Sequence, residues 1–174
     1  HTKIRPRDWS SDVCSSDLGA TFYQDLINEK FVGSAKLRLA KVIAFDNKDV
    51  KLSDRLYNSS NDLRGFEFRG IGPVDNGDHI GGNNLAAISF KSTFPNPIPE
   101  GLKANTFVFY DIGNVWGADY SDVISSNSKI RSSTGVALDL MSPIGPLSFT
   151  YSIPISKTST DKEQRFLFNI GSSF

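Results

Sequence analysis

Apolar and polar residues alternate with a period of two through several stretches of the chain. In one of them, small polar residues separate large apolar ones: Leu147, Phe149, Tyr151 and Ile153 alternate with Ser148, Thr150 and Ser152. Successive side chains of a β-strand point to opposite faces, so this period predicts strands with one apolar face. Strands are predicted at about residues 21–32 (poorly patterned), 34–45, 83–92, 104–113, 131–141, 147–155 and 165–174, with extended structure again at 50–52. The predicted fold class is all-β.

The segments between these predicted strands alternate in length. The segment Ser142-Pro143-Ile144-Gly145-Pro146 forms a tight turn and 94–103 a proline-rich turn, whereas 57–80, 114–130 and 156–164 are long polar loops. Short turns at one end and long loops at the other are typical of antiparallel transmembrane β-barrels, with the long loops outside the cell. A soluble β-sandwich has the same period of two, so the alternation alone leaves both architectures open.

Composition narrows the class of protein further. The chain has 174 residues, and no run approaches the roughly 20 apolar residues of a membrane-spanning helix. Lys and Arg number 19, as do Asp and Glu, so the charge gives no support to nucleic-acid binding. A membrane β-barrel stays compatible with this composition, because each strand needs only about 9–11 residues and every second one is apolar.

The last predicted strand favours a barrel over a sandwich. Its apolar residues Phe166, Phe168, Ile170 and Phe174 share one face, and Gly171 interrupts the strand near its end. A soluble domain with an exposed apolar edge is prone to aggregate, whereas a barrel pairs its last strand with its first.

Residues 1–19 differ from the rest of the chain. They include the only cysteine, Cys14, and residues 9–18 show neither helical nor strand periodicity. No apolar stretch of about 7–15 residues follows the basic residues near the N-terminus, so no signal peptide is indicated. The run resembles a translated sequencing-adapter remnant, with a disordered tail as the alternative. We expect residues 1–19 to be non-native or disordered, and the β-fold to occupy residues 20–174.

No motif predicts an enzyme, a metal site or a cofactor site. The segment Asp75-Asn76-Gly77-Asp78 lacks the alternating acidic ligands and final glutamate of a calcium loop, so a simple turn is predicted. Gly70-Ile71-Gly72 lacks the third glycine of a dinucleotide loop. The only histidines are His1 and His79, too few for a zinc site, and no nucleophile is paired with a base. We expect no enzymatic activity, no cofactor and no bound metal.

Four segments carry a resemblance to a known family. They are, in chain order, Leu63-Arg64-Gly65-Phe66 with Gly70-Ile71-Gly72-Pro73, Phe109-Tyr110-Asp111-Ile112-Gly113-Asn114-Val115-Trp116, the hairpin from Arg131-Ser132-Ser133-Thr134-Gly135 to Pro146-Leu147, and the terminal run 166–174. They resemble the lumen loop, the aromatic-Asp-x-Gly strand, the penultimate hairpin and the terminal recognition signal of the bacterial surface antigen family. Assembly factors of outer-membrane β-barrels are the members of that family that the chain resembles.

The resemblance implies a 16-stranded transmembrane barrel preceded by periplasmic POTRA domains. This chain would supply about seven C-terminal strands of that barrel and no POTRA domain, and would therefore be a fragment.

The resemblance also implies site residues. Arg64, Gly65 and Phe66 would form a motif that seals the lumen, with Asp111 on the inner wall as the partner of the arginine. The family usually has a second acidic residue in the following strand, and Lys91 is the residue expected there, where it would repel Arg64. Phe166, Phe168, Ile170, Gly171 and Phe174 would form the C-terminal side of the barrel seam.

The function implied is folding and insertion of β-barrel proteins into the outer membrane of a Gram-negative bacterium. Its partners would be the lipid bilayer, unfolded outer-membrane proteins, chaperones and assembly-complex lipoproteins, with no nucleic acid. Two alternatives remain open at this point. One is a related two-partner secretion or TamA-like translocation barrel, and the other is a soluble β-sandwich binding module.

Overall fold

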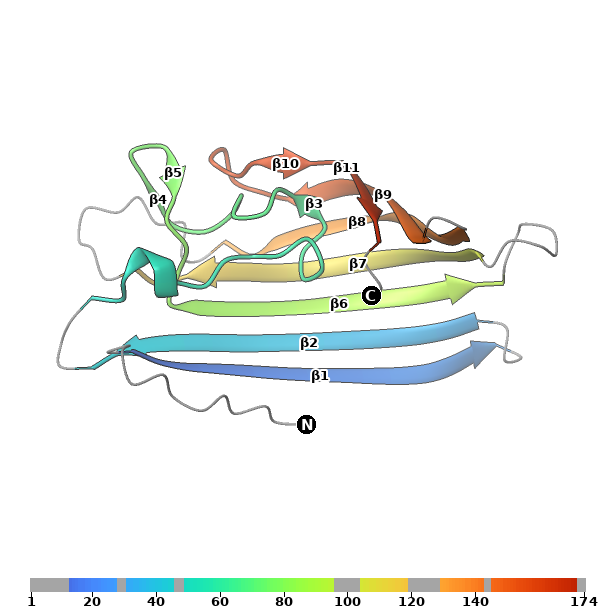
Figure 1. Ribbon diagram of the computed structural model, residues 1–174, viewed down its shortest axis with the longest axis horizontal. Coiled ribbons are helices and arrows are strands. Elements are labelled where there is room, and N and C mark those ends of the chain that lie inside the picture. Colours follow the sequence, from blue (N-terminus) through green and yellow to red (C-terminus); the bar gives the residue numbers. More distant parts are fainter. Residues whose placement is uncertain are drawn as a thin grey trace.

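Seven long strands form one antiparallel sheet (Figure 1). The computed structural model describes residues 13–27, 31–45, 49–95, 104–118, 129–142 and 145–171. The strands lie in the order β1-β2-β6-β7-β8-β9-β11, so consecutive long strands of the chain pair with each other. Their bounds are β1 Val13–Ile27, β2 Phe31–Ala44, β6 Asn84–Phe94, β7 Ala104–Trp116, β8 Arg131–Ser142, β9 Gly145–Ser156 and β11 Phe166–Ile170. The predicted all-β antiparallel fold with about seven strands is confirmed.

Shorter elements lie in the connections between the long strands. They are the 3-10 helix η1 Leu52–Asp54 and the two-residue strands β3 Gly65–Phe66, β4 Val74–Asp75, β5 Asp78–His79 and β10 Glu163–Gln164. Strands β4 and β5 form a hairpin in which Asn76 and Gly77 have φ of 48° and 90°, so the predicted turn is present. The described residues contain no helix that could span a bilayer.

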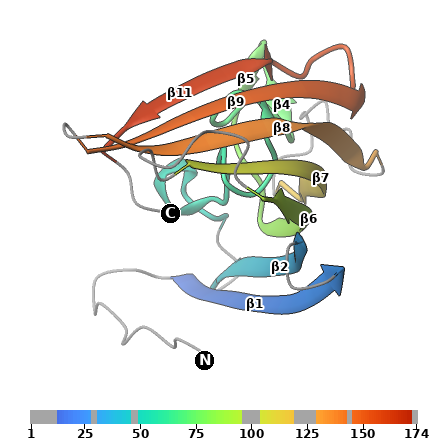
Figure 2. The same ribbon diagram turned by 90° about the vertical axis from the view of Figure 1, so that its right-hand side faces the viewer.

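The two faces of the sheet differ in character. The segment 49–83, which connects β2 to β6, packs on one face, called here the inner face (Figures 1 and 2). It forms a core with that face through Ala40, Leu63, Phe66, Ile71, Leu85, Ala87 and Val115. On the opposite, outer face, apolar side chains from five strands are 37–50% exposed: Leu39, Ile88, Phe90, Val136, Tyr151 and Phe168.

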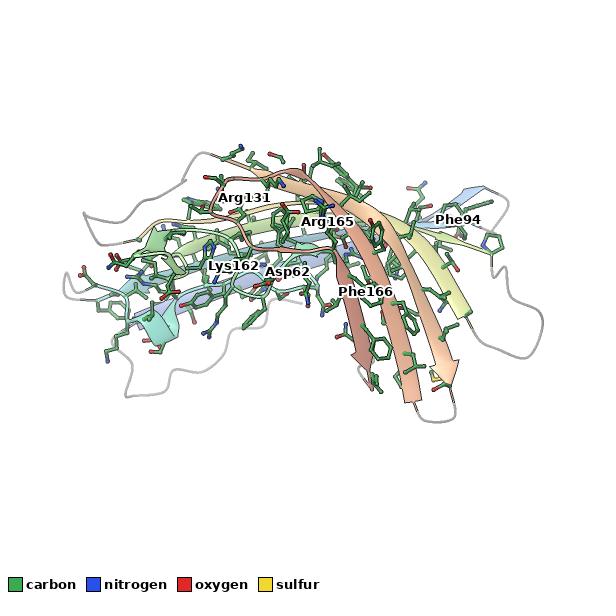
Figure 3. All side chains as sticks on the ribbon, turned by 90° about the horizontal axis from the view of Figure 1, so that it is seen from above. Asp62, Phe94, Arg131, Lys162, Arg165 and Phe166 are labelled. Atoms are coloured by element: carbon green, nitrogen blue, oxygen red, sulfur yellow. The ribbon has the colours of Figure 1, made fainter. Side chains whose placement is uncertain are left out.

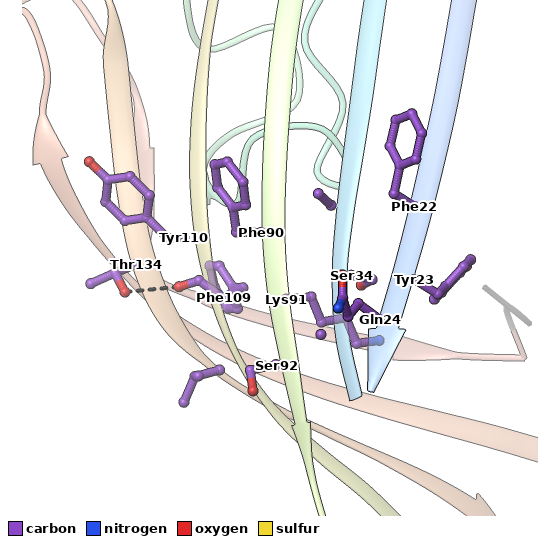
Figure 4. Close-up of a pocket in the computed structure, with 13 residues that line it drawn as sticks. Phe22, Tyr23, Gln24, Ser34, Phe90, Lys91, Ser92, Phe109, Tyr110 and Thr134 are labelled. Carbon is purple, nitrogen blue, oxygen red and sulfur yellow. Dashed lines mark hydrogen bonds between the residues drawn. The ribbon is translucent and has the colours of Figure 1, made fainter. Parts of the chain in front are cut away.

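The outer face is also where aromatic side chains gather. Phe22, Phe90 and Tyr110, from β1, β6 and β7, border a shallow pocket on it (Figure 4). Beside that pocket the Thr134 hydroxyl donates a hydrogen bond of 2.8 Å to the carbonyl of Phe109, which ties β8 to β7. An outer face this apolar would be unfavourable in water, because it is contiguous over the sheet.

The sheet is open. Strands β1 and β11 lie at opposite edges and do not pair with each other. The strand β11 pairs with β9 through five residues, from Phe166 opposite Tyr151 to Ile170 opposite Leu147. The β6–β7 and β8–β9 pairs each extend over eleven residues. The last strand is therefore the most weakly attached of the long strands.

Three segments differ from what the pattern predicts. The range 21–32, predicted as one strand, contains the end of β1 at Ile27 and the start of β2 at Phe31, which pair with each other. Strand β1 begins at Val13, so residues 13–19 pair with β2 although they belong to the segment expected to be non-native or disordered. Backbone hydrogen bonds, which need no apolar pattern, extend the pairing into this segment. Residues 50–52, predicted as extended, instead lead into η1, because Arg55 Nε binds the Val50 carbonyl and closes a tight turn. The origin of residues 1–19 stays a prediction.

Gly135 marks a close approach of backbones in the sheet. A Cβ at this position would lie 2.1 Å from the Tyr151 carbonyl oxygen and 2.7 Å from the Phe109 ring, whereas a Cβ at Gly19 would meet nothing within 4 Å. We expect Gly135→Ala in the full-length protein to cost about 1–3 kcal/mol of folding free energy, through overpacking. Val136→Ala, at the neighbouring half-exposed position of β8, is the control and should change the unfolding midpoint little. Equal midpoints for the two variants in a denaturant titration would contradict the expected packing.

Candidate functional site

The segment 57–82 brings Arg64 onto the inner face. Asp111, in β7, is fully buried there and carries the partner carboxylate. Arg64 Nε lies 2.8 Å from Asp111 Oδ2 and Arg64 Nη2 lies 3.0 Å from Oδ1, a bidentate pair. The Arg64 backbone N–H adds a third bond of 3.0 Å to Oδ2. The structure thus brings together the two residues that the resemblance paired.

Aromatic rings and strand hydroxyls complete the surroundings of Arg64. Its guanidinium carbon lies 3.9 Å from the centroid of the Phe109 ring, a cation–π contact. Its carbonyl accepts a hydrogen bond from the hydroxyl of Ser133 in β8. The side chain of Arg64 is only 12% exposed. The position of Arg64 is therefore fixed by the ion pair with Asp111, by the cation–π contact with Phe109 and by its backbone hydrogen bonds.

Ser89, and not Lys91, completes the polar network. Ser89 lies directly opposite Asp111 in the β6–β7 register, whereas Lys91 lies opposite Phe109. The Ser89 hydroxyl donates to Asp111 Oδ1 at 2.6 Å and accepts from Arg64 Nη2 at 2.6 Å. Ser89 and Lys91 share the inner face of β6, and it is Ser89 that contacts Asp111 and Arg64. The alignment of Lys91 with the family's second acidic residue stays a prediction. The Lys91 ammonium lies 3.6 Å from the centroid of the Phe107 ring.

The two residues after Arg64 fit the wall closely. Gly65 has φ of 90°, in the left-handed region that favours glycine. A Cβ at Gly65 would lie 3.2 Å from the Cβ atoms of Ser133 and Ser152, so only glycine allows this approach to β8 and β9 without displacement. Phe66, 1% exposed, packs in the core between the loop and the sheet.

Asp62 fixes the other side of the same loop to β2. Its carboxylate pairs with Arg38 and, at 3.3 Å, with Lys36, and it accepts a bond of 2.8 Å from the Ser59 hydroxyl. Burial opposes ionisation of Asp62, but the Ser59 bond and the charges of Arg38 and Lys36 outweigh burial and lower the pKa of the carboxyl. Loop 57–82 is therefore anchored to β2 through Asp62 and to β7 through Arg64.

A second loop, 157–165, holds the first one from above the sheet. Strand β10 pairs with β3, placing Glu163 opposite Phe66 and Gln164 opposite Gly65. Two more backbone bonds extend the contact: Glu67 N–H donates to the Lys162 carbonyl at 3.0 Å, and Lys162 N–H donates to the Gly70 carbonyl at 2.9 Å. The position of Gly65 thus depends on both loops.

Beside this site the inner face borders a polar cavity of about 480 Å³. Its lining includes charged and amide side chains from five strands and the loop: Lys36, Arg64, Lys91, Asn105, Asp139 and Asn169. A hydrated space fits this lining, since an isolated buried charge would be costly without water. The inner face is polar here, in contrast to the outer face.

The terminal strand places its predicted residues on the outer face. Phe166, Phe168 and Ile170 are 58%, 43% and 59% exposed. Phe168 packs on Phe149 of β9, with ring centroids 4.8 Å apart. Gly171 follows with φ of 76° and donates to the Pro146 carbonyl at 2.8 Å, so the chain turns there. Phe174 lies outside the described residues.

The sequence gives only weak signals for three members of this site. Ser89 could have been found from strand register, because it shares the inner face with Lys91 and lies opposite Asp111. Asp62 precedes the Arg64 motif by two residues, but nothing in the sequence identifies Arg38 as its partner. Arg131 lies in one of the four segments that carry the resemblance. Its guanidinium forms a buried ion pair with Asp161, 3.0 Å away, but the polar loop 157–165 that contains Asp161 has no distinguishing pattern. Chemically, the assembled site is a set of ion pairs and backbone bonds that hold a loop against a wall.

Comparison with known proteins gives one family. Residues 9–174 match the family model of the Omp85 superfamily domain. The chain is 30% identical over 155 residues to the outer membrane protein assembly factor BamA of Neisseria meningitidis serogroup B, covering 73% of this chain and 19% of that protein. It is 27% identical over 162 residues to the BamA of Neorickettsia risticii, covering 91% of this chain and 22% of that protein. The chain thus spans about a fifth of the length of these relatives.

A solved structure is similar in fold as well as in sequence. The crystal structure of BamA from Haemophilus ducreyi lacking POTRA domains 1-3 superposes with a TM-score of 0.75 and is 29% identical. The superposition covers 90% of this chain and 34% of that one. The partial-barrel architecture expected from the sequence is confirmed by this neighbour.

We expect Arg64→Ala to release the loop in the full-length protein. Removing one partner of a buried ion pair costs about 3–5 kcal/mol, because the carboxylate of Asp111 would stay buried without its cation. Protease cleavage within 57–82 should then accelerate more than about 100-fold when cleavage follows the open population. Arg69→Ala is the matched control, since Arg69 is an exposed arginine in the same loop that stacks on Tyr57. Similar cleavage rates for both variants would show that the Arg64 pair does not hold the loop.

The Asp62 contact should weaken in acid. Because the pKa of Asp62 is lowered by folding, its contribution to loop stability is complete above the ordinary value of 3.8 and is lost as pH falls through the folded value. Hydrogen exchange in residues 57–67 should therefore differ between the wild type and Asp62→Asn near neutral pH and converge in acid. Asp49→Asn removes an exposed carboxylate of the same connection and should match the wild type throughout. A wild-type advantage that persists unchanged into strong acid would contradict this role.

Proposed function

Because this chain belongs to the Omp85 superfamily, we propose that it is the C-terminal barrel part of an outer-membrane protein assembly factor that folds and inserts β-barrel proteins. The observation that carries the proposal is the pairing of Arg64 with Asp111, which holds a loop against the polar inner face of a sheet whose outer face is apolar. The BamA relatives bear the assembly-factor name, and the sheet superposes on one of their barrels.

The proposed location is the outer membrane of a Gram-negative bacterium. In that setting the outer face would contact lipid, which accounts for a contiguous apolar surface that water would disfavour. The polar inner face and its cavity would line the hydrated lumen. The upstream strands of a longer chain would continue the sheet from the edge at β1.

The proposed mechanism is non-covalent and needs no cofactor or nucleotide. The barrel would open at the seam beside β11, and an incoming unfolded protein would pair with a free strand edge by β-augmentation. Phe166, Phe168, Ile170, Gly171 and Phe174 would form the C-terminal side of that seam. The partners would be unfolded outer-membrane proteins, their chaperones, assembly-complex lipoproteins and the bilayer, with no nucleic acid.

A test starts by recovering the full-length gene upstream of this chain. The encoded protein is then reconstituted into liposomes, and folding of an unfolded outer-membrane β-barrel protein is followed by its gain of protease resistance. We expect faster folding than in empty liposomes, and slower folding with Arg64→Ala. Transport of an unfolded polypeptide into the liposome lumen, without insertion, would instead support the two-partner secretion or TamA-like alternative. A protein that stays monomeric in water without detergent would count against a membrane-embedded barrel.

The assignment of faces yields a separate prediction. Leu138 and Phe149 lie opposite each other on the outer face of β8 and β9. Replacing both with arginine should block assembly of the full-length protein into membranes, because each charge near the bilayer midplane costs about 2–4 kcal/mol.

The matched control is Asn169→Arg, on the inner face of β11 where Asn169 borders the polar cavity. This variant should assemble like the wild type when the membrane fraction is assayed for protease-resistant protein. Normal assembly of Leu138→Arg with Phe149→Arg would exclude a lipid-facing role for this surface.

A further inference from the structure

A second arginine–aspartate pair lies deeper in the molecule than the first. Arg131, at the start of β8, and Asp161, in loop 157–165, have fully buried side chains. Arg131 Nε lies 3.1 Å from Asp161 Oδ2 and Arg131 Nη2 lies 3.0 Å from Oδ1, so this pair is also bidentate. Asp161 Oδ2 accepts a further bond of 2.6 Å from the Thr158 backbone N–H. Arg131 also donates to the Asn114 side chain and to the Lys129 carbonyl.

The buried Arg131–Asp161 pair lies close in the chain to the terminal strand β11, because only residues 162–165 separate Asp161 from its start. Two residues after Asp161 the chain enters β10, which pairs with Gly65 and Phe66 of the sealing motif. Arg165 follows directly after β10, and its carbonyl accepts a hydrogen bond of 2.7 Å from the Ser152 N–H in β9. Strand β11 then begins at Phe166. Figure 3 follows this path from Arg131 through Lys162 and Arg165 to Phe166.

The loop that carries Arg64 and the terminal strand β11 therefore both depend on residues 161–165. Strand β11 has five register pairs with β9, and within the described ranges no strand pairs with its other edge. Strand β3 has two register pairs, both with β10. Moving residues 161–165 would disturb both at once, since β10 contacts the sealing motif directly and β11 follows it after a single residue.

From this connectivity we infer that Arg131 and Asp161 are positioning residues that couple the lumen loop to the terminal strand. The pair fixes loop 157–165, which holds Gly65 and Phe66 on one side and the start of β11 on the other. Opening the edge at β11 and withdrawing the Arg64 loop are then one coupled motion. The inference rests on the proposed function, in which β11 borders the seam, and it adds residues that bias the opening of that seam.

Bidentate geometry explains the choice of residues. A buried ion pair is stable only when both oxygens of the carboxylate receive hydrogen bonds. The planar guanidinium of arginine donates two parallel bonds to them, which the single ammonium group of lysine cannot do. Arg131→Lys keeps the charge and loses the second bond, so it separates geometry from charge. Exposed charges in the same loop offer a control, because Lys157 pairs with Glu163 at the surface with its side chain 46% exposed.

The test is hydrogen exchange followed by mass spectrometry on the folded full-length protein. We expect Arg131→Lys and Asp161→Asn to accelerate exchange in 65–67 and in 166–170 by the same factor, at least about fivefold, the low end of couplings between protein sites. Exchange in 84–94 of β6 should stay as in the wild type, which excludes a general loss of stability. Lys157→Gln should change none of these segments.

Two further variants make the coupling decisive. Asp111→Asn weakens the Arg64 pair from the β7 side, away from Arg131 and Asp161. If the two segments are coupled, hydrogen exchange should accelerate in 166–170 as well as in 65–67. The exchanged pair, Arg131→Asp with Asp161→Arg, should restore protection relative to either single change. Acceleration confined to 157–165, or equal acceleration in all segments including 84–94, would overturn the inference.

The exchange result is independent of assembly activity. Coupled exchange without faster folding of substrate in liposomes would count against the proposed function and leave the coupling standing. Assembly activity that persists while 65–67 and 166–170 exchange independently would overturn the coupling and leave the function standing.

Discussion

A carboxylate buried on the face of a β-sheet is stable only when a cation pairs with it. In this protein the carboxylate is that of Asp111, and the cation, Arg64, comes from a loop. Asp111 is fully enclosed, and its hydrogen bonds come from Arg64, through both side chain and backbone, and from Ser89. Without the loop, the inner wall would carry an uncompensated charge, which is among the most costly defects in a folded protein. The loop therefore completes the wall, and the glycine beside the arginine lets it approach closely enough to do so.

The two buried arginine–aspartate pairs differ in which element supplies the arginine. In one the loop supplies the arginine and a strand the aspartate; in the other the strand supplies Arg131 and the loop Asp161. Each loop is thus fixed to the wall by its own ion pair, and the two loops are joined by the backbone pairing of β3 with β10. The ion pairs thus act together with the hydrophobic core that Leu63, Phe66 and Ile71 form with the inner face, and both give the first loop a defined position.

Much of the fold could be predicted because period-two alternation reports directly on strands. The β8 and β9 pattern gave nearly the observed bounds, and the Arg64 and Asp111 motifs gave a pair that the structure places in contact. Register was harder, since Ser89 and Lys91 share a face and only the pairing of β6 with β7 decides which one meets Asp111. Asp161 could not be foreseen, because its partner lies thirty residues away in the chain and its own loop has no period.

The sequential strand order has a consequence for the order of folding. Every long-strand pairing joins consecutive long strands, so the sheet can grow strand by strand, with one long closure, residues 45–83 between β2 and β6. The Arg64 contact spans 47 residues and requires β6 and β7 to be present, and the Gly65 pairing requires residues beyond β9 as well. The loop on the inner face therefore acquires its full set of contacts only when β10 is present, and a chain that ends before β10 would lack the β3–β10 pairing that holds Gly65 and Phe66.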